Sequence, residues 1–560
     1  MATYLRRFGP HQSMSPHKVG NSFFIQPQHV AQLSAVLVIA LVVAPWLNPF
    51  ASGPSAAVTP LLVAWTCAAL LVLLWQPAAW QPVALGWLVA GLASTLIALC
   101  QFFDLEQVFS PWINQAEPGL AFANLRQRNQ FATLTHIAQA ALLFGFLSQP
   151  LTRTVRGWAL VAAAVLAVGS AASSSRTGLL QLALLVMLAL GWAWHAQRQA
   201  RKTKANLQAF KASHLLDLKC LQWSCVVIFF YVLSAWALPR LAGLDPAEHG
   251  IFARLSQDLG CSSRRVLWAN VLELIGQRPW LGWGWGELDY AHYMHFYSNP
   301  QPEQRFCAIL DNAHNLPLHL AVELGLPFAV LASAGAVWWV LRQRPWAERK
   351  PVRQMAWSVL ALVGLHSLLE FPLWYGPFQI AVGLSLALLM ATPDSNATPN
   401  KAKTFYRHAP VAVIFAMACA VVLTYAAWDY WRVSQIYLPP DERSTSYREN
   451  TLAKLRASVL FEGHVQFAEL TLTTLSASNA SQVYPLAKTV LHFSPEPRVV
   501  EKLIESATFL GFDEEALLHL ARYRAAHPQE YQAWQTRQKA PAAAPTPAPA
   551  SNQVASQPIN

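Results

Sequence analysis

Arginine, histidine and amide side chains gather in five short segments of this chain, and these residue types can bind an anion and move a proton. The first segment places Arg126, Gln127, Arg128 and Asn129 directly before an apolar run. Two guanidinium groups at a helix N-terminus favour an anion site. Arginines that only reach from a membrane helix toward water would give the same pattern.

Two further segments carry arginine. The sequence SSSRTG at 173–178 offers hydroxyl groups and Arg176, which suit a phosphate oxygen, although an ordinary capping turn would look similar. Arg264 and Arg265 precede PWLGWGWGE at 279–287, where glycines permit close backbone approach. Trp283 and Trp285 suit stacking on sugar rings or an interfacial aromatic belt. Dinucleotide binding by GxGxxG is excluded, because the strand before the motif is missing.

Two histidine segments supply a possible base. DNAHN at 311–315 sets His314 among Asn312 and Asn315, where an imidazole could take a proton from a hydroxyl, although a lone histidine is usually structural. HSLLEFPLWY at 366–375 places His366 and Glu370 on one helix face, with Tyr375 beyond. A carboxylate near lipid depth needs a partner, either His366 or an arginine, and could be a structural ion pair.

Together these groups suit an anionic, pyrophosphate-bearing lipid and a hydroxyl nucleophile activated by a base. We expect no metal and no cofactor, since no CxxC or HExxH spacing occurs. Cys261 and Cys307 could form a disulfide in an oxidising compartment or remain free thiols.

The elements that position these segments are predicted to be membrane helices. The chain has 560 residues, of which 54% are hydrophobic and 12% charged, with a mean hydropathy of +0.28. Soluble domains average about 25% charged residues. We therefore predict an all-α, polytopic membrane protein with about eleven (10–12) spans. The apolar runs lie near 29–47, 56–75, 79–100, 129–148, 155–173, 177–195, 221–238, 315–341, 354–369, 376–392 and 409–428.

The net charge of +11 is explained by orientation. With the N-terminus in the cytoplasm, the inner segments hold 19 Lys and Arg, whereas the outer segments up to residue 428 hold 9, all arginine. The basic loops are divided among helices, so a nucleic-acid partner is not expected. This topology places all five polar segments on the outer face.

The predicted organisation has four parts. Residues 1–28 are cytoplasmic, with no cleavable signal, and 29–428 form the transmembrane catalytic body, interrupted by an outer loop at 239–312. Residues 429–538 form a helical outer domain, and the Ala/Pro-rich tail 539–560 is expected to be disordered.

The five motifs resemble those of bacterial O-oligosaccharyltransferases of the PglL type, in the superfamily of O-antigen ligases and O-antigen polymerases. They are RQRNQFA (126–132), SSSRTG (173–178), PWLGWGWGE (279–287), DNAHNLPLHLAVELG (311–325) and HSLLEFPLWYGPF (366–378). The resemblance implies a multi-pass protein of the bacterial inner membrane with its active site facing the periplasm. It implies a metal-independent transfer of a glycan from undecaprenyl-pyrophosphate to Ser or Thr of a pilin or another periplasmic protein.

The resemblance also assigns roles to residues. His314 matches the family's essential histidine and is expected to be the base, while Arg128 and Arg176 match arginines that hold the pyrophosphate. Glycan stacking is expected of Trp283 and Trp285. The remaining predicted substrate-binding residues are Arg126, Gln127, Asn129, Arg264, Arg265, Asn312, Asn315, His366, Glu370 and Tyr375.

Three other functions are compatible with the sequence. An O-antigen ligase would transfer the same glycan to a lipid A core sugar, and a polymerase would transfer it to another lipid-linked repeat. A lipid or solute transporter would perform no chemistry, but transporters place polar residues near the bilayer midplane, where the predicted spans here have few.

Overall fold

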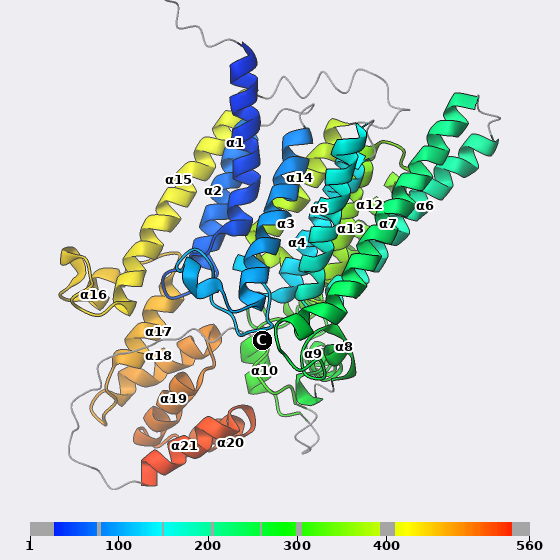
Figure 1. Ribbon diagram of the computed structural model, residues 1–560. Helices are drawn as coiled ribbons and strands as arrows, with labels where there is room; N and C mark the ends of the chain where they lie inside the picture. Colours follow the sequence, from blue (N-terminus) through cyan, green and yellow to red (C-terminus); the bar gives the residue numbers. More distant parts are fainter. Residues whose placement is uncertain are drawn as a thin grey trace, which may run out of the picture.

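The structure is a computed structural model that describes residues 27–74, 80–147, 151–202, 207–257, 260–297, 305–392 and 409–539. Every regular element within these ranges is a helix, which confirms the all-α prediction (Figure 1). The predicted cytoplasmic N-terminus and the Ala/Pro-rich tail lie outside the described residues, except at their inner edges.

Long apolar helices form a bundle in the upper half of Figure 1. Each of the eleven predicted runs falls on a helix of this described bundle, and the run 315–341 is divided in two at Gly325. The helices are α1 (Pro27–Leu47), α2 (Val58–Leu74), α3 (Trp80–Phe102), α4 (Arg128–Ala140) with the π-helical η3 (Ala141–Leu147), α5 (Arg153–Ala172), α6 (Arg176–Lys202), α7 (Leu207–Leu241), α11 (Leu316–Leu324), α12 (Leu326–Gln343), α13 (Pro351–Ser367), α14 (Gly376–Ala391) and α15 (Ala409–Ser434).

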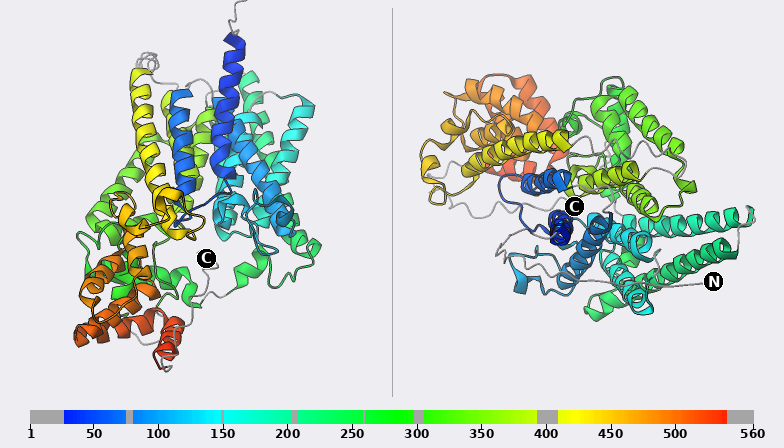
Figure 2. Two further views of the ribbon diagram at one scale, coloured as in Figure 1. Left: turned by 90° about the vertical axis from the view of Figure 1, so that its left-hand side faces the viewer. Right: turned by 90° about the horizontal axis from the view of Figure 1, so that it is seen from above.

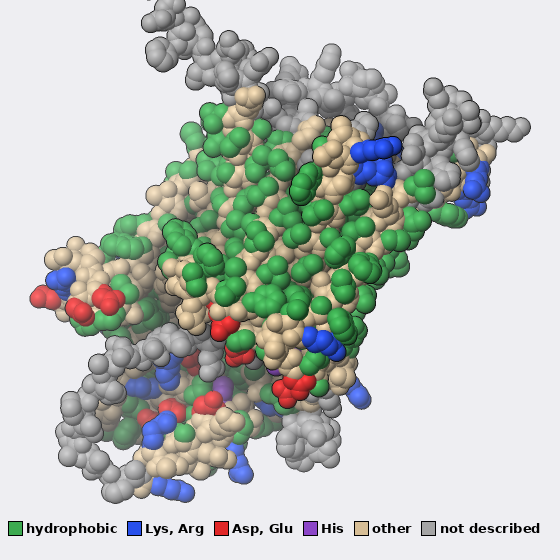
Figure 3. Space-filling model, viewed as in Figure 1, with side chains coloured by type: hydrophobic (Ala, Val, Ile, Leu, Met, Phe, Trp, Pro, Cys, Tyr) green, Lys and Arg blue, Asp and Glu red, His purple; other side chains and the backbone are tan. Residues whose placement is uncertain are grey.

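Five helices of the described chain are long and apolar enough to cross a membrane. They are α3, α5, α6, the part of α7 from Leu218 to Leu241, and the segment Pro410–Tyr437 that contains α15. The exact number of spans and their orientation remain predictions. Figure 3 shows an apolar bundle face with lysine and arginine near its upper end and charges of both signs at its lower end.

Small residues let the bundle helices approach closely. A side chain at Gly91 of α3 would meet Ala138 of α4 at 2.4 Å, and one at Gly376 of α14 would meet Ala64 of α2 at 2.2 Å. Such contacts between small residues are typical of membrane helix packing. Around them, large buried side chains such as Trp87 fill the core.

The second part of the molecule lies below the bundle in Figures 1 and 2. It consists of loop helices and a C-terminal helical array, and Tyr293 of α10 is buried in the core of that array. The loop elements are η1 (Glu106–Phe109), η2 (Ala123–Leu125), α8 (Ile251–Ser256), α9 (Arg264–Gln277) and α10 (Leu288–Met294). The array contains α16 (Thr451–Leu455), α17 (Glu462–Leu472), α18 (Ala480–Phe493), α19 (Pro497–Phe509), α20 (Asp513–Ala526) and α21 (Pro528–Lys539).

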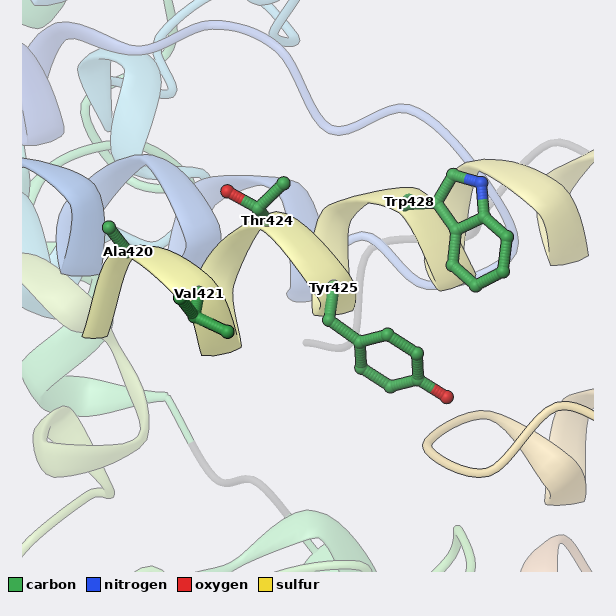
Figure 4. A pocket seen from close by; sticks show the side chains of 5 residues that line it. All are labelled: Ala420, Val421, Thr424, Tyr425 and Trp428. Atoms are coloured by element: carbon green, nitrogen blue, oxygen red, sulfur yellow. The ribbon is translucent and has the colours of Figure 1, made fainter. Parts of the chain in front are cut away.

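An open hollow of about 580 Å³ lies on α15, which packs along α2 at the edge of the bundle. Figure 4 shows its lining side chains, which come from one helix: Ala420, Val421, Thr424, Tyr425 and Trp428. The predicted site residues do not line it, and its apolar lining offers little that could catalyse a reaction. We regard it as part of a lipid-facing helix surface.

Candidate active site

The five polar segments meet at one end of the bundle. They occupy the start of α4, the turn between α5 and α6, the start of α9, the loop before α11 and the turn after α13. In Figure 1 these positions lie at the lower end of the bundle, above the C-terminal array. Hydrogen bonds and electrostatic contacts between residues far apart in the sequence join these segments.

One carboxylate joins its own segment to three of the others. Glu370 lies in the turn after α13, and its side chain is only 7% exposed. Its Oε2 accepts a hydrogen bond from Nδ1 of His314 at 2.7 Å. Its Oε1 accepts one from Nδ2 of Asn129 at 3.0 Å and another from the guanidinium of Arg264. Sequence reasoning offered His366 or an arginine as the partner of Glu370, and the structure shows Arg264 together with His314.

The electrostatics of Glu370 favour its charged form. Burial, the largest effect, raises the pKa of this carboxyl group, but the hydrogen bond from His314 and the charge of Arg264 outweigh it and hold the pKa below its usual range. Glu370 is therefore an anion at neutral pH, and an anion is the stronger hydrogen-bond acceptor for an imidazole N–H.

His314 is held in one orientation. Its backbone has a positive φ of +49°, a conformation that costs free energy for a residue with a side chain and that concentrates at functional sites. Its N–H donates to Oδ1 of Asn312 at 2.8 Å, and its ring stands edge-on against Phe371 with centroids 4.9 Å apart. Because Nδ1 faces Glu370, Nε2 lies on the side of the ring away from this carboxylate.

The serine-rich turn is joined to the same network. Oγ of Ser175 donates to Oδ1 of Asn129 at 2.6 Å, so the turn holds the amide that donates to Glu370. The guanidinium of Arg176 donates to the backbone carbonyls of Arg254 and Gln257 in the outer loop. Backbone carbonyls carry no net charge, so the positive charge of Arg176 is not neutralised by these contacts.

Arg254 is a part of this site that the sequence did not single out. It lies on α8, and its pKa is lowered to about 10, mainly by burial and further by the charges of Arg128 and Arg176. The charge of Glu370 acts on it in the opposite direction. The charges of Arg128, Arg176 and Glu370 therefore all act on the Arg254 guanidinium. Arg254 is one of six arginines in the loop 239–312, and only the fold distinguishes it from the others.

Several predicted site residues instead hold local structure. Arg126 donates to the carbonyl of Pro49, and Gln127 caps α4 through the N–H of Gln130 at 2.7 Å. Asn315 caps α11 through the N–H of Leu318 at 3.0 Å and donates to the carbonyl of Leu368. These contacts fix the loops that carry the network but leave less of each side chain for a ligand.

The last members of the predicted set differ in their surroundings. Tyr375 stacks on Phe371, the ring that also contacts His314, so it lies within reach of the network. Arg265 is exposed at the start of α9. His366 is fully buried and hydrogen-bonded through Nδ1 to Thr133 at 2.9 Å, which keeps it inside the bundle.

The tryptophan-glycine loop packs against protein backbone. The N–H of Trp283 donates to the carbonyl of Val322 at 2.8 Å, and that of Gly284 donates to the carbonyl of Glu323 at 3.0 Å. At Gly282, φ is +69° and a side chain would lie 2.3 Å from the Glu323 carbonyl oxygen. Gly282 therefore allows this loop to approach the end of α11 closely.

The two tryptophans in this loop are not equivalent. Arg278 lies over the ring of Trp283 at 4.2 Å, so one face of that ring is covered. Trp285 is 67% exposed and keeps the larger free surface for contact with a sugar or a lipid headgroup.

A disulfide closes the outer loop around the network. Cys261 and Cys307 are bonded, with Cα atoms 5.4 Å apart. Cys261 lies three residues before Arg264, and Cys307 lies seven residues before His314. The bond therefore links the chain segments that bring these two donors to Glu370.

The fold and this network define a class: a polytopic helical membrane protein with an arginine- and histidine-rich site at one end of its bundle. Two family models match the chain. The one described as "O-Antigen ligase" matches residues 161–333, and the one described as "Virulence factor membrane-bound polymerase, C-terminal" matches residues 354–541.

Two curated relatives come from Acinetobacter baylyi (strain ATCC 33305 / BD413 / ADP1). The "General O-oligosaccharyltransferase" is 25% identical over 353 residues, which cover 62% of this chain and 55% of the relative. The "ComP-specific O-oligosaccharyltransferase" is 23% identical over 290 residues, covering 52% and 47% respectively. The chain thus spans about half the length of these relatives. These matches confirm the resemblance drawn from the motifs, which is to PglL-type O-oligosaccharyltransferases in the superfamily of O-antigen ligases and O-antigen polymerases.

Proposed function

We propose that this protein transfers a preassembled glycan from an undecaprenyl-pyrophosphate carrier to Ser or Thr hydroxyl groups of a pilin or another periplasmic protein. The observation that carries the proposal is the network in which Glu370 accepts hydrogen bonds from His314, Asn129 and Arg264, with Arg254 next to it. The names of the two relatives support protein O-glycosylation in general. The proposal places the protein in the bacterial inner membrane with this network facing the periplasm.

In the proposed reaction, the acceptor oxygen attacks the anomeric carbon of the first sugar directly. The bond between that carbon and the phosphate oxygen breaks, and the diphosphate leaves with the electron pair. Nε2 of His314 takes the hydroxyl proton while Nδ1–H donates to Glu370, which holds the ring in the tautomer that a base requires. Direct displacement inverts the configuration at the anomeric carbon.

The arginines stabilise the leaving group. As the glycosidic bond breaks, negative charge grows on the diphosphate, and fixed cations directed at that charge lower the barrier. We assign this role to Arg128, Arg176 and Arg254. The charges of Arg128 and Arg176 both lower the pKa of Arg254, which supports a shared role for the three side chains. Arg264 is paired with Glu370 and is assigned to positioning that carboxylate. The proposal needs no metal ion to neutralise the diphosphate.

A second acceptor class is supported by the family match at residues 161–333, whose description is "O-Antigen ligase". Donor chemistry would be the same, and only the hydroxyl that receives the glycan would differ. A lipid A core sugar as acceptor is therefore the alternative that the assay must separate from a protein acceptor.

The test is to express the protein with a pathway that makes a lipid-linked glycan, a candidate pilin and a lipopolysaccharide acceptor in one bacterial host. Intact-mass spectrometry of the pilin should show addition of one whole glycan, and His314→Ala, inserted at wild-type level, should abolish it. Glycan found on lipopolysaccharide and absent from the pilin would establish the alternative. Glycosylation at the wild-type rate by His314→Ala would remove His314 as the base.

A further inference from the structure

Deeper inside the bundle than the network, a second layer of polar side chains crosses between helices. Thr133 of α4, Gln181 of α6 and His366 of α13 have exposures of 0%. The Thr133 hydroxyl lies 2.9 Å from Nδ1 of His366 and 2.9 Å from Nε2 of Gln181. Nε2 of Gln181 also donates to the carbonyl of Leu362 on α13 at 3.0 Å. Buried polar groups within a membrane bundle are costly unless paired, and they often mark functional positions.

This layer repeats the arrangement of the Asn129–Glu370 contact in the network, at a spacing of one helical turn. On α4, Thr133 follows Asn129 by four residues, and its hydroxyl donates to the Asn129 carbonyl at 2.8 Å. Toward the end of α13, Glu370 follows His366 by four residues, and its N–H donates to the His366 carbonyl at 2.8 Å. Residues four apart lie on the same helix face.

Each layer therefore links α4 to the end of α13, and we call these two links the outer rung and the inner rung. Asn129 with Glu370 forms the outer rung, and Thr133 with His366 forms the inner rung. In the outer rung, Glu370 also contacts His314, whereas the inner rung is buried inside the bundle. The inner rung fixes the rotation and height of α13 against α4, and these two quantities decide where the Glu370 carboxylate lies.

We propose that Thr133, Gln181 and His366 are positioning residues that act on the reaction through Glu370. This inference rests on the proposed function for its kinetic readout. It reassigns His366, which the sequence indicated as a substrate-binding residue, because its imidazole is fully buried inside the bundle and hydrogen-bonded to Thr133.

The test uses Thr133→Val, which keeps the side-chain shape and removes the hydroxyl. Loss of one buried hydrogen-bonded rung should lower kcat about tenfold. The KM for the lipid-linked donor should change less than twofold, because the arginines remain in place. Thr135→Val is the matched control: Thr135 is also fully buried on α4, but its hydroxyl donates to Ala132 of the same helix. This control should retain at least half of the wild-type kcat.

Two further comparisons separate positioning from simple destabilisation. His366→Asn places an amide near the position of Nδ1 and should recover most of the activity that His366→Leu loses. In a Glu370→Gln background, Thr133→Val should have little further effect, because a residue that acts through Glu370 cannot act when that carboxylate is gone. Multiplying effects in the double variant, or an equal loss in Thr135→Val, would overturn the inference.

A readout independent of activity is hydrogen exchange of the detergent-solubilised full chain, followed at the peptide that contains Glu370. Thr133→Val should accelerate exchange there at least fivefold, and Thr135→Val should not. If the wild-type protein transfers no glycan, the proposed function fails while this measurement still decides the inner rung: unchanged exchange in Thr133→Val would reject it.

Discussion

Replacing Glu370 with glutamine tests the centre of the network with the smallest change in shape. The carboxylate accepts three hydrogen bonds, from His314, Asn129 and Arg264. The amide keeps one acceptor oxygen but replaces the other with an N–H₂ group, which cannot accept from either the imidazole or the guanidinium. The change therefore breaks at least one charge-assisted hydrogen bond. The acceptor oxygen that remains no longer carries a negative charge.

The expected size of the effect follows from these bonds. Hydrogen bonds to charged groups contribute about 1.5–3 kcal/mol each. If about 3–4 kcal/mol of orientation and charge stabilisation is lost in the transition state, the rate falls by about 10²–10³-fold. The free energy of unfolding should change less, because the Arg264 side chain is 36% exposed and water can solvate it once its partner is gone.

The assay is transfer of glycan to a purified acceptor by detergent-solubilised enzyme at matched protein levels, between pH 5.5 and 8. The depressed pKa of Glu370 means that its interactions are present above the ordinary carboxyl pKa and disappear only as the pH falls through the lower value. The ratio of wild-type to variant activity should therefore stay constant over this range.

The control is Glu273→Gln on α9, which alters a carboxylate that also contacts a histidine, His295, at 2.7 Å, but away from Glu370. It should reduce activity by no more than about twofold. Activity of Glu370→Gln within threefold of wild type, with normal insertion, would refute the orienting role of Glu370.

Three other predictions concern the loop that encloses the network. Arg254→Gln should lower kcat/KM for the donor at least about tenfold, whereas Arg240→Gln, which removes an exposed arginine stacked on Trp236, should have less than a twofold effect. Cys261→Ser and Cys307→Ser should each lower the thermal midpoint and activity to the same degree as the double variant, since one bond is lost in all three; an additive double variant would contradict this. Burial and the charges of neighbouring carboxylates raise the pKa of Asp289 to about 7. Folding stability should therefore fall as the pH rises from about 4 to 7, and Asp289→Asn should flatten that dependence. An unchanged slope of the thermal midpoint against pH in this variant would contradict the prediction.

The sequence predicted the bundle well because hydropathy and charge bias are properties of consecutive residues. Each apolar run became a helix, and the five polar segments meet at one end of the bundle. The pairing within the site could not be found in this way. Helix periodicity in the sequence identifies neighbours four residues apart, such as His366 and Glu370. His314 and Glu370 are 56 residues apart, so periodicity could not predict their contact.

The sequence also did not show which group approaches the glycine at 282. Glycine indicates that something approaches the backbone closely, but composition alone does not say what. Here the approaching group is the end of α11, since both Gly282 and Gly325 have positive φ and would place a side chain within 2.3 Å of backbone on the opposite segment. Gly282 and Gly325 therefore allow the loop at 279–287 to pack against the end of α11.

The charges of the site favour the binding of an anion. Arg264 is neutralised by Glu370, and this pair uses the carboxylate that could otherwise neutralise its neighbours. The guanidinium of Arg176 is satisfied by neutral carbonyl groups, and Arg254 experiences enough repulsion from Arg128 and Arg176 to add to the lowering of its pKa. Bringing cations together in a partly buried place raises the free energy of the folded protein, and a bound dianion or trianion would relieve that repulsion.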